Sequence, residues 1–407
     1  MKAIILVGGE GLRLRPLTCN LPKPMVPIIN KPFLEHMIEH LKRHHVDEII
    51  LAICHLPDLI QSHFGDGSGF GVKLSYAVEK TPLGTGGAVK NAEQSLDDTF
   101  LVFNGDIFSD LDLTEMIRFH QAHKAKATIA LTPVEDPTAY GVVELDTKDR
   151  VKGFVEKPSW ERVTSNLINA GTYVLEPEVL KLIPSGIHCM LERGLFPDLV
   201  TKGIPFYGYR SNAYWLDTGK PADYLKLHHD LLMGKAFARL PGKPMADDVW
   251  LEEGCDIHSS VKLVGPVVIG KGCTIEQDAE ISGPAVLGNG CIIGQGSIID
   301  EAILWQNVRL GKKVTVRNSV VGNNSAIGDN TWVTDGSIVS DDVVIGKATS
   351  WSTVSRSGRG RSSKITLSHF REGRNAPSDK VRHRRLERRN RRGFHLRQRS
   401  SLRSRGG

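Results

Sequence analysis

The spacing of hydrophobic residues changes its period near residue 250, and this change divides the chain into two regions. In residues 1–232, short apolar runs typical of buried strands alternate with segments whose apolar residues recur every three or four positions, as on one helix face. The expected strands are 3–7, 48–53, 72–78 and 99–104, and the expected helices are 33–41 and 86–96. This alternation predicts an α/β fold with a doubly wound, mostly parallel sheet that binds ligands at the carboxyl ends of its strands.

Residues 250–350 follow a six-residue period instead, with one aliphatic residue in each unit and small residues between. The aliphatic positions are Ile269, Ile275, Ile281, Leu287, Ile293, Ile299, Ile327, Val333, Val339 and Ile345. This period predicts a parallel β-helix of about five coils, each made of three hexapeptides, with an irregular loop near 300–306. Cys255, Cys273 and Cys291 are 18 residues apart, which predicts that their side chains stack as internal packing residues.

Two segments lie outside these patterns. Glycines and prolines indicate a linker over 233–249, and 351–407 is expected to be a basic, disordered tail because its Ser, Gly and Arg cannot bury a core. From Arg356 onward the chain has 18 basic and 3 acidic residues, which leaves 34 and 43 in residues 1–355, so the folded part is acidic. The tail is interpreted as a segment that binds nucleic acid or acidic surfaces, as a solvated extension without a role, or as the product of a shifted reading frame. We expect no specific nucleic-acid partner.

The cysteines and the hydropathy of the chain indicate the cellular compartment in which the protein is expected. The six cysteines form no C-x-x-C pair, which favours a reducing cytoplasm with free thiols. No apolar stretch is long enough to span a membrane, and the first apolar run is too short for a signal peptide. We therefore expect a cytoplasmic protein without a membrane partner. His36, His40 and His44 share one helical stripe, which we interpret as a solvated helix face rather than a metal site.

A glycine-rich segment directly follows the first predicted strand. Because its glycines lack a Cβ, backbone N–H groups can approach phosphate oxygens, and Arg13 and Lys23 add two cations. The segment is not a P-loop, since no Lys-Ser/Thr follows the glycines. It also lacks the third glycine of the dinucleotide fingerprint, where Leu14 stands. These donors and cations predict a site for a triphosphate.

The complete string resembles the signature of one enzyme family. Gly8 to Thr18 reads GGEGLRLRPLT and is followed by Pro22-Lys23-Pro24, which is similar to the G-G-x-G-x-R-L-x-P-L-T and K-P signature of sugar nucleotidyltransferases (sugar-nucleotide pyrophosphorylases), with Leu12 where many members have Thr. Five further segments match in the family's order: Pro82–Ala88, Val102–Asp106, Phe154–Pro158, Asn169–Tyr173 and Tyr214–Gly219. The resemblance implies a Rossmann-like nucleotidyltransferase domain over 1–232 and, over 250–350, the left-handed β-helix that many members carry.

The resemblance also implies roles for individual residues. The acceptor phosphate is already ionised at neutral pH, so catalysis consists of positioning and charge neutralisation rather than general-base chemistry. The implied catalytic residues are Arg13, Lys23, Asp106 and Asp217, and both aspartates would hold Mg²⁺. The implied nucleotide contacts are Leu6, Gly8, Gly9, Gly11, Glu79, Pro82, Gly84 and Thr85. The implied sugar-phosphate contacts are Gly141, Glu156, Lys157 and Asn169.

Glu79 bears on the choice of nucleotide. Relatives that use uridine or thymidine nucleotides often have Gln at this position, whereas the two carboxylate oxygens match the adjacent N1–H and N2–H donors of guanine. With the Pro-Leu-Gly-Thr string and the β-helix, Glu79 makes the chain most similar to mannose-1-phosphate guanylyltransferases. The expected reaction joins an NTP to a sugar 1-phosphate and releases pyrophosphate. The expected NTP is GTP, and the expected sugar 1-phosphate is mannose 1-phosphate.

Three alternatives stay open. The chain could be a glucose-1-phosphate uridylyl- or thymidylyltransferase. It could be a non-catalytic regulatory paralogue that binds sugar nucleotide, although such a protein need not keep both metal carboxylates. An acyltransferase that used the β-helix would need a histidine base, and His258 is the one histidine in that region. In each case we expect a homo-oligomer that assembles through the β-helix.

Overall fold

The computed structural model describes residues 1–245 and 248–352, and by their contacts these residues belong to one compact unit. Residues 353–407, which include nearly all of the predicted tail, lie outside the described residues. Among the described helices, none is both long and apolar enough to cross a membrane.

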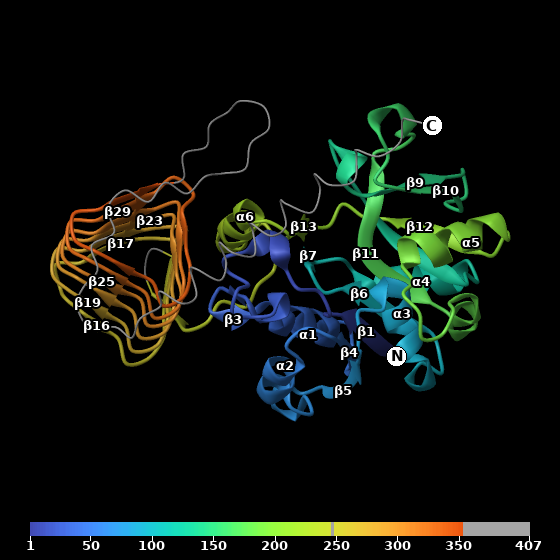
Figure 1. Cartoon of the computed structure of the whole chain (residues 1–407), viewed down its shortest axis with the longest axis horizontal. Coiled ribbons are helices and arrows are strands. Elements are labelled where there is room, and N and C mark those ends of the chain that lie inside the picture. Colours follow the sequence, from blue (N-terminus) through green and yellow to red (C-terminus); the bar gives the residue numbers. More distant parts are fainter. Residues whose placement is uncertain (246–247, 353–407) are drawn as a thin grey trace, which may run out of the picture. The chain divides into compact units, whose positions relative to one another are not determined.

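The first region is built on a nine-stranded mixed sheet of order β10-β9-β11-β6-β1-β4-β5, with β8 between β11 and β12 (Figure 1). Its strands are β1 (Lys2–Leu6), β4 (Glu48–Ile53), β5 (Lys73–Val78), β6 (Phe100–Asn104), β8 (Ala127–Pro133), β9 (Gly141–Leu145), β10 (Val151–Glu156), β11 (Leu167–Leu175) and β12 (Phe206–Arg210). The predicted parallel arrangement is confirmed for β6-β1-β4-β5. The other half is mixed, because β11 runs antiparallel to β6, β8 and β9.

Six α-helices accompany this sheet within the described residues. They are α1 (Phe33–Arg43), α2 (Pro57–Phe64), α3 (Gly84–Asn91), α4 (Leu113–Ala122), α5 (Phe196–Thr201) and α6 (Pro221–Leu232). The helix expected over 86–96 is shorter than predicted, since a 3₁₀ turn over Glu93–Ser95 follows it. Two small ribbons lie beside the sheet: β2 (Pro27–Ile28) pairs with β3 (Lys31–Pro32), and β7 (Ile107–Ser109) pairs with β13 (Trp215–Asp217).

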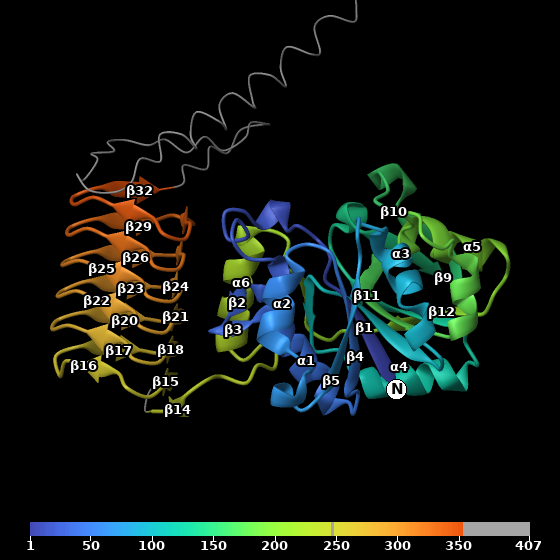
Figure 2. The ribbon, with the colours of Figure 1, turned by 60° about the horizontal axis from the view of Figure 1, so that its bottom comes forward.

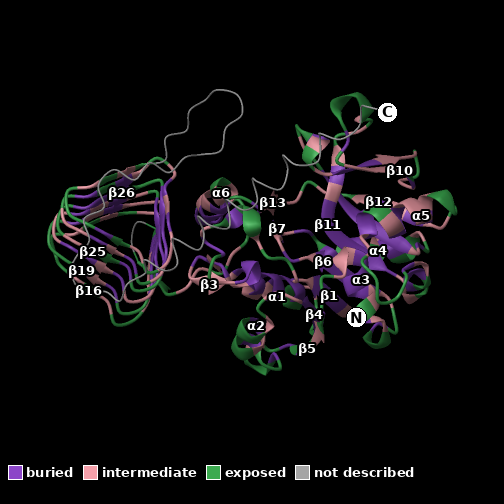
Figure 3. Ribbon diagram, in the orientation of Figure 1, coloured by how far each residue is buried: buried purple, intermediate pink, exposed green. Residues whose placement is uncertain are grey.

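The central strands are covered on both faces. Ala3, Ile4 and Ile5 of β1 are completely buried, and Figure 3 shows the purple interior running along β1 and its neighbours. A strand buried on both faces needs a continuous apolar run, as parallel strands usually have. This explains why the sequence pattern identified β1 and β4 without any alternation of polar residues.

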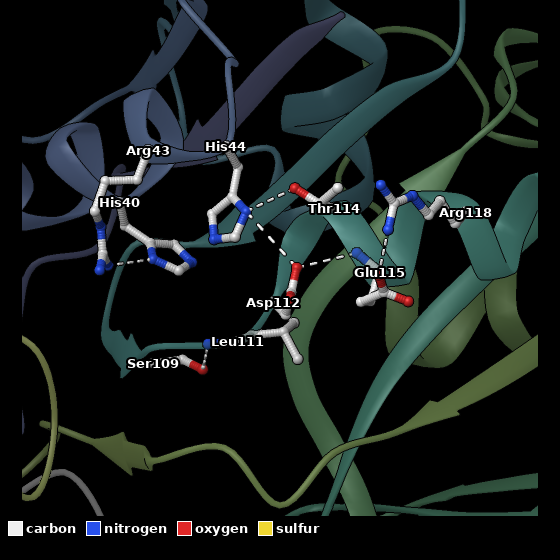
Figure 4. A network of polar contacts seen from close by, with 9 residues as sticks. All are labelled: His40, Arg43, His44, Ser109, Leu111, Asp112, Thr114, Glu115 and Arg118. Carbon is white, nitrogen blue, oxygen red and sulfur yellow. Dashed lines mark hydrogen bonds and ion pairs between the residues drawn. The ribbon is translucent and has the colours of Figure 1, made fainter.

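The histidine stripe of α1 is buried, so the prediction of a solvated face is wrong. His36 and His40 are only 6% and 7% exposed. The Arg43 guanidinium donates to His40 Nδ1 at 2.9 Å, and His44 Nδ1 lies 2.9 Å from Thr114 Oγ1 (Figure 4). The bonds to Nδ1 let these imidazole rings lie on a helix face that packs inward, although the buried Nε2 of His40 has no hydrogen-bond partner. Hydrophobic periodicity does not distinguish such a face from a solvated one. Burial lowers the pKa of His40 to about 3, so its ring is neutral.

The second region is a parallel β-helix with three faces (Figure 2). One face holds β15 (Val249–Leu251), β18 (Val267–Ile269), β21 (Ala285–Leu287), β24 (Ile303–Leu304), β27 (Val320–Val321) and β30 (Ile338–Val339), and β14 (Lys243–Pro244) pairs antiparallel with β15. The second holds β16 (Asp256–Ile257), β19 (Thr274–Ile275), β22 (Ile292–Ile293), β25 (Arg309–Leu310), β28 (Ala326–Ile327) and β31 (Val344–Ile345). The third holds β17 (Lys262–Val264), β20 (Glu280–Ser282), β23 (Ile298–Asp300), β26 (Thr315–Arg317), β29 (Trp332–Thr334) and β32 (Ser350–Ser352).

The predicted ladder of aliphatic residues points into the β-helix. All ten predicted aliphatic positions are buried. Cys273 and Cys291 are completely buried, and their thiols donate to the carbonyl oxygens of Gly288 and Trp305 at 3.2 and 3.0 Å. The six-residue period therefore identified both the fold and the packing role of these cysteines.

The coil count and the expected loop need correction. Residues 249–352 form six coils rather than five, and no irregular loop interrupts them near 300–306. Paired strands are 18 residues apart in the first coils, but Ile298 pairs with Thr315 and Ile303 with Val320, 17 residues apart. The next aliphatic residue of the internal ladder after Ile299 is Leu304, five positions on, so one residue is missing at this corner of the coil. A search for a strict period of six overlooks such a shortened step.

Candidate active site

The ends of four segments bring the predicted catalytic residues together. Arg13 lies in the 3₁₀ turn Leu12–Leu14 after the glycine loop, and Lys23 begins the turn Lys23–Met25. Asp106 lies between β6 and β7, and Asp217 ends β13. The β7–β13 pairing places Asp217 opposite Ile107, so the two aspartates, 111 positions apart in the chain, face one site.

These four side chains form one charged cluster. Lys23 Nζ lies 3.2 Å from Asp106 Oδ2 and 4.0 Å from Asp217 Oδ1. Arg13 Nη2 lies 3.7 Å from Asp217 Oδ2. Lys23 is 8% exposed, whereas Arg13 extends into solvent. The cluster therefore has a buried ammonium group between two carboxylates and a guanidinium group at its open side.

Asp217 fits a cation ligand. Its Oδ1 is buried and has no hydrogen-bond partner. Burial raises the pKa of this carboxyl group, and the negative charge of Asp106 raises it further. A buried carboxylate oxygen without a donor is costly, and a bound cation would remove that cost. The described residues contain no group of three or more His, Cys, Asp or Glu that could hold a metal, so any further ligands would have to be water or substrate phosphate oxygens.

Two glycines of the motifs are required by geometry. Gly11 has φ +63°, the left-handed conformation that a residue with a Cβ adopts only with strain, and its carbonyl accepts a 2.7 Å hydrogen bond from Thr18. A Cβ on Gly219 would lie 2.8 Å from Arg13 Nη2 and 2.9 Å from Asp217 Oδ1. The glycine that ends the Tyr214–Gly219 motif therefore leaves room for the Arg13–Asp217 contact.

The predicted nucleotide residues fall into two groups. Leu6 is the last residue of β1, and Gly8, Gly9 and Gly11 follow it in the glycine loop. Glu79 follows β5, two strands away, yet its Oε1 lies 3.6 Å from the position of a Cβ on Gly8. Glu79 is 8% exposed, and its Oε2 accepts the Leu83 N–H at 2.8 Å. Burial raises the pKa of Glu79. The Leu83 N–H engages Oε2 and orders the 80–83 turn, so Oε1, and not the pair of oxygens predicted from the sequence, is left to meet the N–H edge of a base.

The amino end of α3 is occupied by protein. Both Gly86 N–H and Gly87 N–H donate to the Cys189 carbonyl oxygen, at 2.9 and 3.0 Å. A Cβ on Gly84 would lie 2.7 Å from that same oxygen. The segment Pro82–Thr85 therefore rests on residues 189–191 and does not offer these two amides to a phosphate.

Glu192 is a polar site residue that the sequence analysis missed. It is 8% exposed and accepts the Thr85 hydroxyl at 2.7 Å, while the Thr85 oxygen accepts Leu191 N–H at 2.8 Å. Burial raises the pKa of Glu156, and the charge of Glu192 raises it further. Glu192 thus lies between the predicted nucleotide and sugar residues. It stands in an irregular helical turn, Leu191–Leu195, that matches no motif of the resemblance.

The predicted sugar-phosphate residues gather at the ends of β9, β10 and β11. A Cβ on Gly141 would lie 2.9 Å from Glu156 Oε2. Lys157 Nζ lies 3.9 Å from Glu156 Oε1, and the Lys157 N–H donates to Tyr140. The Asn169 amide is engaged within β11, because its Oδ1 accepts Gly171 N–H at 2.9 Å and its Nδ2 donates to the Tyr173 hydroxyl at 2.9 Å.

Trp215 links the sugar segments to the aspartate cluster. Its indole N–H donates to the Ala170 carbonyl at 3.0 Å, and its ring packs edge-on against Tyr140, with centroids 5.4 Å apart. It stands two residues before Asp217. The segments over 140–141, 169–171 and 215–217 therefore form one connected wall beside the charged cluster.

Comparison with known proteins identifies the family of the chain. The family model described as nucleotidyl transferase matches residues 2–234, and a model described as the EIF2B subunit epsilon LbH domain, a left-handed β-helix, matches residues 246–351. The chain belongs to the nucleotidyl transferase family.

Relatives with curated names cover most of the chain. A mannose-1-phosphate guanylyltransferase of Mycobacterium tuberculosis is 36% identical over 310 residues, 76% of this chain and 80% of the relative. A UTP–glucose-1-phosphate uridylyltransferase of Synechocystis is 37% identical over 329 residues, 76% of this chain and 84% of the relative. A probable mannose-1-phosphate guanylyltransferase of Arabidopsis thaliana is 41% identical over 284 residues, 66% of this chain and 76% of the relative.

One solved structure supports the fold. The crystal structure of a protein described as a glucose-1-phosphate thymidylyltransferase, from Bacillus anthracis and in complex with sucrose, has a TM-score of 0.53 and 24% identity. It covers 59% of this chain and 98% of that chain. The likeness shows the fold of the first region.

Proposed function

We propose that this protein transfers a nucleotidyl group from an NTP to a sugar 1-phosphate and releases pyrophosphate. A phosphate oxygen of the sugar 1-phosphate attacks the α-phosphorus of the NTP, and the bond from that phosphorus to the bridging oxygen breaks. The electron pair leaves with pyrophosphate, so the products are a sugar nucleotide and pyrophosphate. No proton has to be removed, because the attacking phosphate oxygen is already ionised at neutral pH.

The observation that carries this proposal is the cluster of Arg13, Lys23, Asp106 and Asp217. The reaction brings two highly charged anions together, so its barrier falls when cations are held in place beforehand. Lys23 is held by both aspartates at 3.2 and 4.0 Å, and we assign it to the nucleotide phosphates. Arg13 is anchored on Asp217 while its guanidinium group stays open to solvent, which suits contact with the departing pyrophosphate.

Enzymes of this family generally use a divalent metal, and we propose Mg²⁺ here. Asp106 and Asp217 would hold it, since Asp217 Oδ1 is buried and unpartnered and the described cluster offers only oxygen ligands. When bound, Mg²⁺ supplies positive charge to the triphosphate and to the leaving pyrophosphate. Lys157 would hold the phosphate of the sugar, and Glu156 would accept hydrogen bonds from sugar hydroxyls.

We propose GTP and mannose 1-phosphate as the preferred substrates. Glu79 supports the choice of GTP, because its Oε1 is directed toward the glycine loop while its Oε2 is occupied by Leu83 N–H. A buried carboxylate accepts N–H groups and cannot donate, which suits the N–H edge of guanine better than the mixed edge of a pyrimidine. Two of the relatives described above bear the name mannose-1-phosphate guanylyltransferase.

The direct test is a pyrophosphate-release assay with the full-length protein. Four NTPs are crossed with mannose, glucose and galactose 1-phosphates in the presence of Mg²⁺. The largest kcat/KM is expected for GTP with mannose 1-phosphate. The highest value for UTP or dTTP with glucose 1-phosphate would support the uridylyl- or thymidylyltransferase alternative, and no turnover with any pair would overturn the proposed activity.

We also propose a division into a catalytic domain over 1–232, a linker over 233–249 and a β-helix over 250–350, with homo-oligomers assembled through the β-helix in the cytoplasm. The free cysteines of the described residues agree with a reducing compartment. Light scattering of the full chain, compared with residues 1–352, tests the oligomer. A monomer at micromolar concentration in both samples would contradict it.

A further inference from the structure

The hairpin that follows Lys23 has an unfavourable backbone conformation. The two residues between β2 and β3 are Ile29, with φ 47°, and Asn30, with φ 63°. Asparagine tolerates the left-handed region, but a β-branched residue such as isoleucine does so only when its surroundings enforce it. Ile29 is 1% exposed, so its side chain is packed into the interior. The hairpin therefore depends on contacts from other parts of the chain.

Those contacts come from side chains distant in sequence. The Tyr224 hydroxyl donates to the Pro27 carbonyl oxygen at 2.6 Å, and Ile29 N–H donates to His228 Nε2 at 3.1 Å. His228 Nδ1–H in turn donates to the Tyr224 carbonyl oxygen at 3.0 Å, which fixes its tautomer. Both residues belong to α6, so one turn of this helix holds the strained hairpin.

Residues outside α6 hold the other hairpin groups. His36 Nε2–H donates to the Ile28 carbonyl oxygen at 2.9 Å, and Asn30 Nδ2 donates to the Leu287 carbonyl oxygen of the β-helix at 2.8 Å. The hairpin is thus bonded to both regions of the chain.

Trp305 of the β-helix completes the arrangement. It is 2% exposed, follows β24, and donates its indole N–H to the Tyr224 hydroxyl at 2.9 Å. The hydroxyl therefore accepts from Trp305 while it donates to Pro27. Accepting the indole N–H orients the hydroxyl proton toward Pro27, and two such bonds in series strengthen each other. Burial of the fully enclosed Tyr224 keeps its hydroxyl protonated by raising its pKa above the usual value.

Tyr224 is close in sequence to Asp217, and its hydroxyl is bonded to Pro27, four residues after Lys23. It stands seven residues after Asp217, at the start of the helix that follows that motif, and the hairpin it holds begins four residues after Lys23. The turn between is short and bonded, because Val26 N–H donates to the Lys23 carbonyl at 3.1 Å and Phe33 N–H to the Val26 carbonyl at 3.0 Å. A shift of the hairpin would therefore be transmitted to Lys23.

We propose that Trp305 and Tyr224 are positioning residues for nucleotidyl transfer, and that the fourth coil of the β-helix holds Lys23 against Asp106 and Asp217 through the hairpin at 27–32. This inference rests on the proposed function for its catalytic consequence, although the holding of the hairpin can be tested without it. Neither residue touches the reacting groups. Their effect on the reaction passes through the 3.2 Å contact between Lys23 and Asp106.

The test compares Trp305→Phe and Tyr224→Phe with Trp332→Phe in the full-length protein. The first two remove one donor or one hydroxyl and keep a ring, and the third is a matched control because Trp332 is 55% exposed on another face of the β-helix. Hydrogen–deuterium exchange of the segment 22–33 is expected to rise at least fivefold in the first two variants and to stay unchanged in the control. Unchanged exchange in Tyr224→Phe would overturn the proposal, whether or not the wild type turns over any substrate.

Kinetics tests the consequence for catalysis. Trp305→Phe and Tyr224→Phe are each expected to lower kcat about tenfold with less than a twofold change in KM for the sugar 1-phosphate. The double variant is expected to match Tyr224→Phe alone, because both changes act through one hydroxyl. In a Lys23→Met background, Tyr224→Phe should cause no further loss of kcat. A full tenfold loss in that background would show that the effect does not pass through Lys23, and a wild type without activity would count against the proposed function alone.

Discussion

The carboxylate of Glu192 accepts a 2.7 Å hydrogen bond from the hydroxyl of Thr85, 107 positions earlier in the chain. This bond joins a predicted nucleotide residue to a buried acid that also raises the pKa of Glu156, a predicted sugar residue. The two halves of the candidate site therefore share one side chain that neither motif contains. Substitutions at Glu192 are expected to affect both substrates.

Glu192→Ala leaves the Thr85 hydroxyl without its acceptor, and a buried unsatisfied polar group costs about 1–3 kcal/mol. We expect kcat/KM for the NTP to fall by about tenfold or more. Glu192→Gln keeps an acceptor oxygen, so its loss should be under threefold, and it should lower the pKa of Glu156 because a negative charge is removed. Steady-state kinetics of the two variants separates the roles of the hydrogen bond and the charge. Equal losses in both variants would contradict this division.

Asp217→Asn should stabilise the protein while it abolishes turnover. The raised pKa of Asp217 shows that burial and repulsion from Asp106 outweigh its attraction to Lys23 and Arg13 in the absence of metal. Removing the charge therefore favours the folded state, and the midpoint of thermal unfolding should rise in chelator. Asp106→Asn and Asp217→Asn should each lower kcat by several orders of magnitude, since the cation site loses a carboxylate. Near-wild-type turnover of either variant at saturating Mg²⁺ would refute the metal assignment.

Glu79→Gln should reduce the preference for GTP. The amide oxygen can still accept Leu83 N–H, so the 80–83 turn is retained, while the group directed at Gly8 becomes able to donate. The ratio of kcat/KM for GTP to that for UTP should fall by about 1–3 kcal/mol when expressed as free energy. An unchanged ratio, with a preserved thermal midpoint, would mean that Glu79 orders the turn and does not contact the base.

Three buried histidines predict a loss of stability in acid. Burial lowers the pKa of His36, lowers that of His40 to about 3, and lowers that of His228 to about 4. The unfolded chain takes up protons on these rings below pH 6.5, whereas the folded protein resists protonation, so the free energy of unfolding falls as the pH drops from 6.5 toward 4. His40 and His228 each contribute up to about 1.4 kcal/mol per pH unit over that range, and His36 adds a loss of the same sign.

Denaturant unfolding at pH 7.5, 6 and 5 measures this loss. In His228→Gln the free energy of unfolding should fall less steeply with decreasing pH than in the wild type. The difference in slope should correspond to about one proton, because the amide oxygen can accept Ile29 N–H without titrating. His63→Gln, at an exposed position, is the matched control and should decline as the wild type does. The same pH dependence in all three proteins would show that His228 protonates equally in the folded and unfolded states.

Much of the fold was predictable because its signals are local. The apolar runs of β1 and β4 each lie within a few consecutive residues, and the β-helix pattern recurs every six residues. Each signal can therefore be read from a short stretch of sequence. Arg13 and Lys23 were predicted from the glycine-rich segment itself. Asp106 and Asp217 were assigned only through the resemblance, because the pairing of β7 with β13, which brings them together, leaves no periodic trace in the sequence.

The missed features share a different physical origin. Glu192, Tyr224 and Trp305 make side-chain hydrogen bonds to residues distant in the chain, and a single sequence contains no signal for such bonds. The burial of His36 and His40 was also missed, because a stripe of titratable rings on a helix is compatible with either a wet or a packed face. The mixed character of the sheet was missed because β11 is as apolar as a parallel strand.

The two shortened steps of the β-helix, from Ile299 to Leu304 and from Val316 to Val321, occur at the same corner of successive coils. A residue lost at a corner changes the perimeter of one turn but leaves each flat face in register with its neighbours above and below. A residue lost within a face would turn the buried aliphatic residues of that strand outward. Tolerance to insertion and deletion in this region is therefore a property of the corners, and length variation among descendants of this chain should accumulate there.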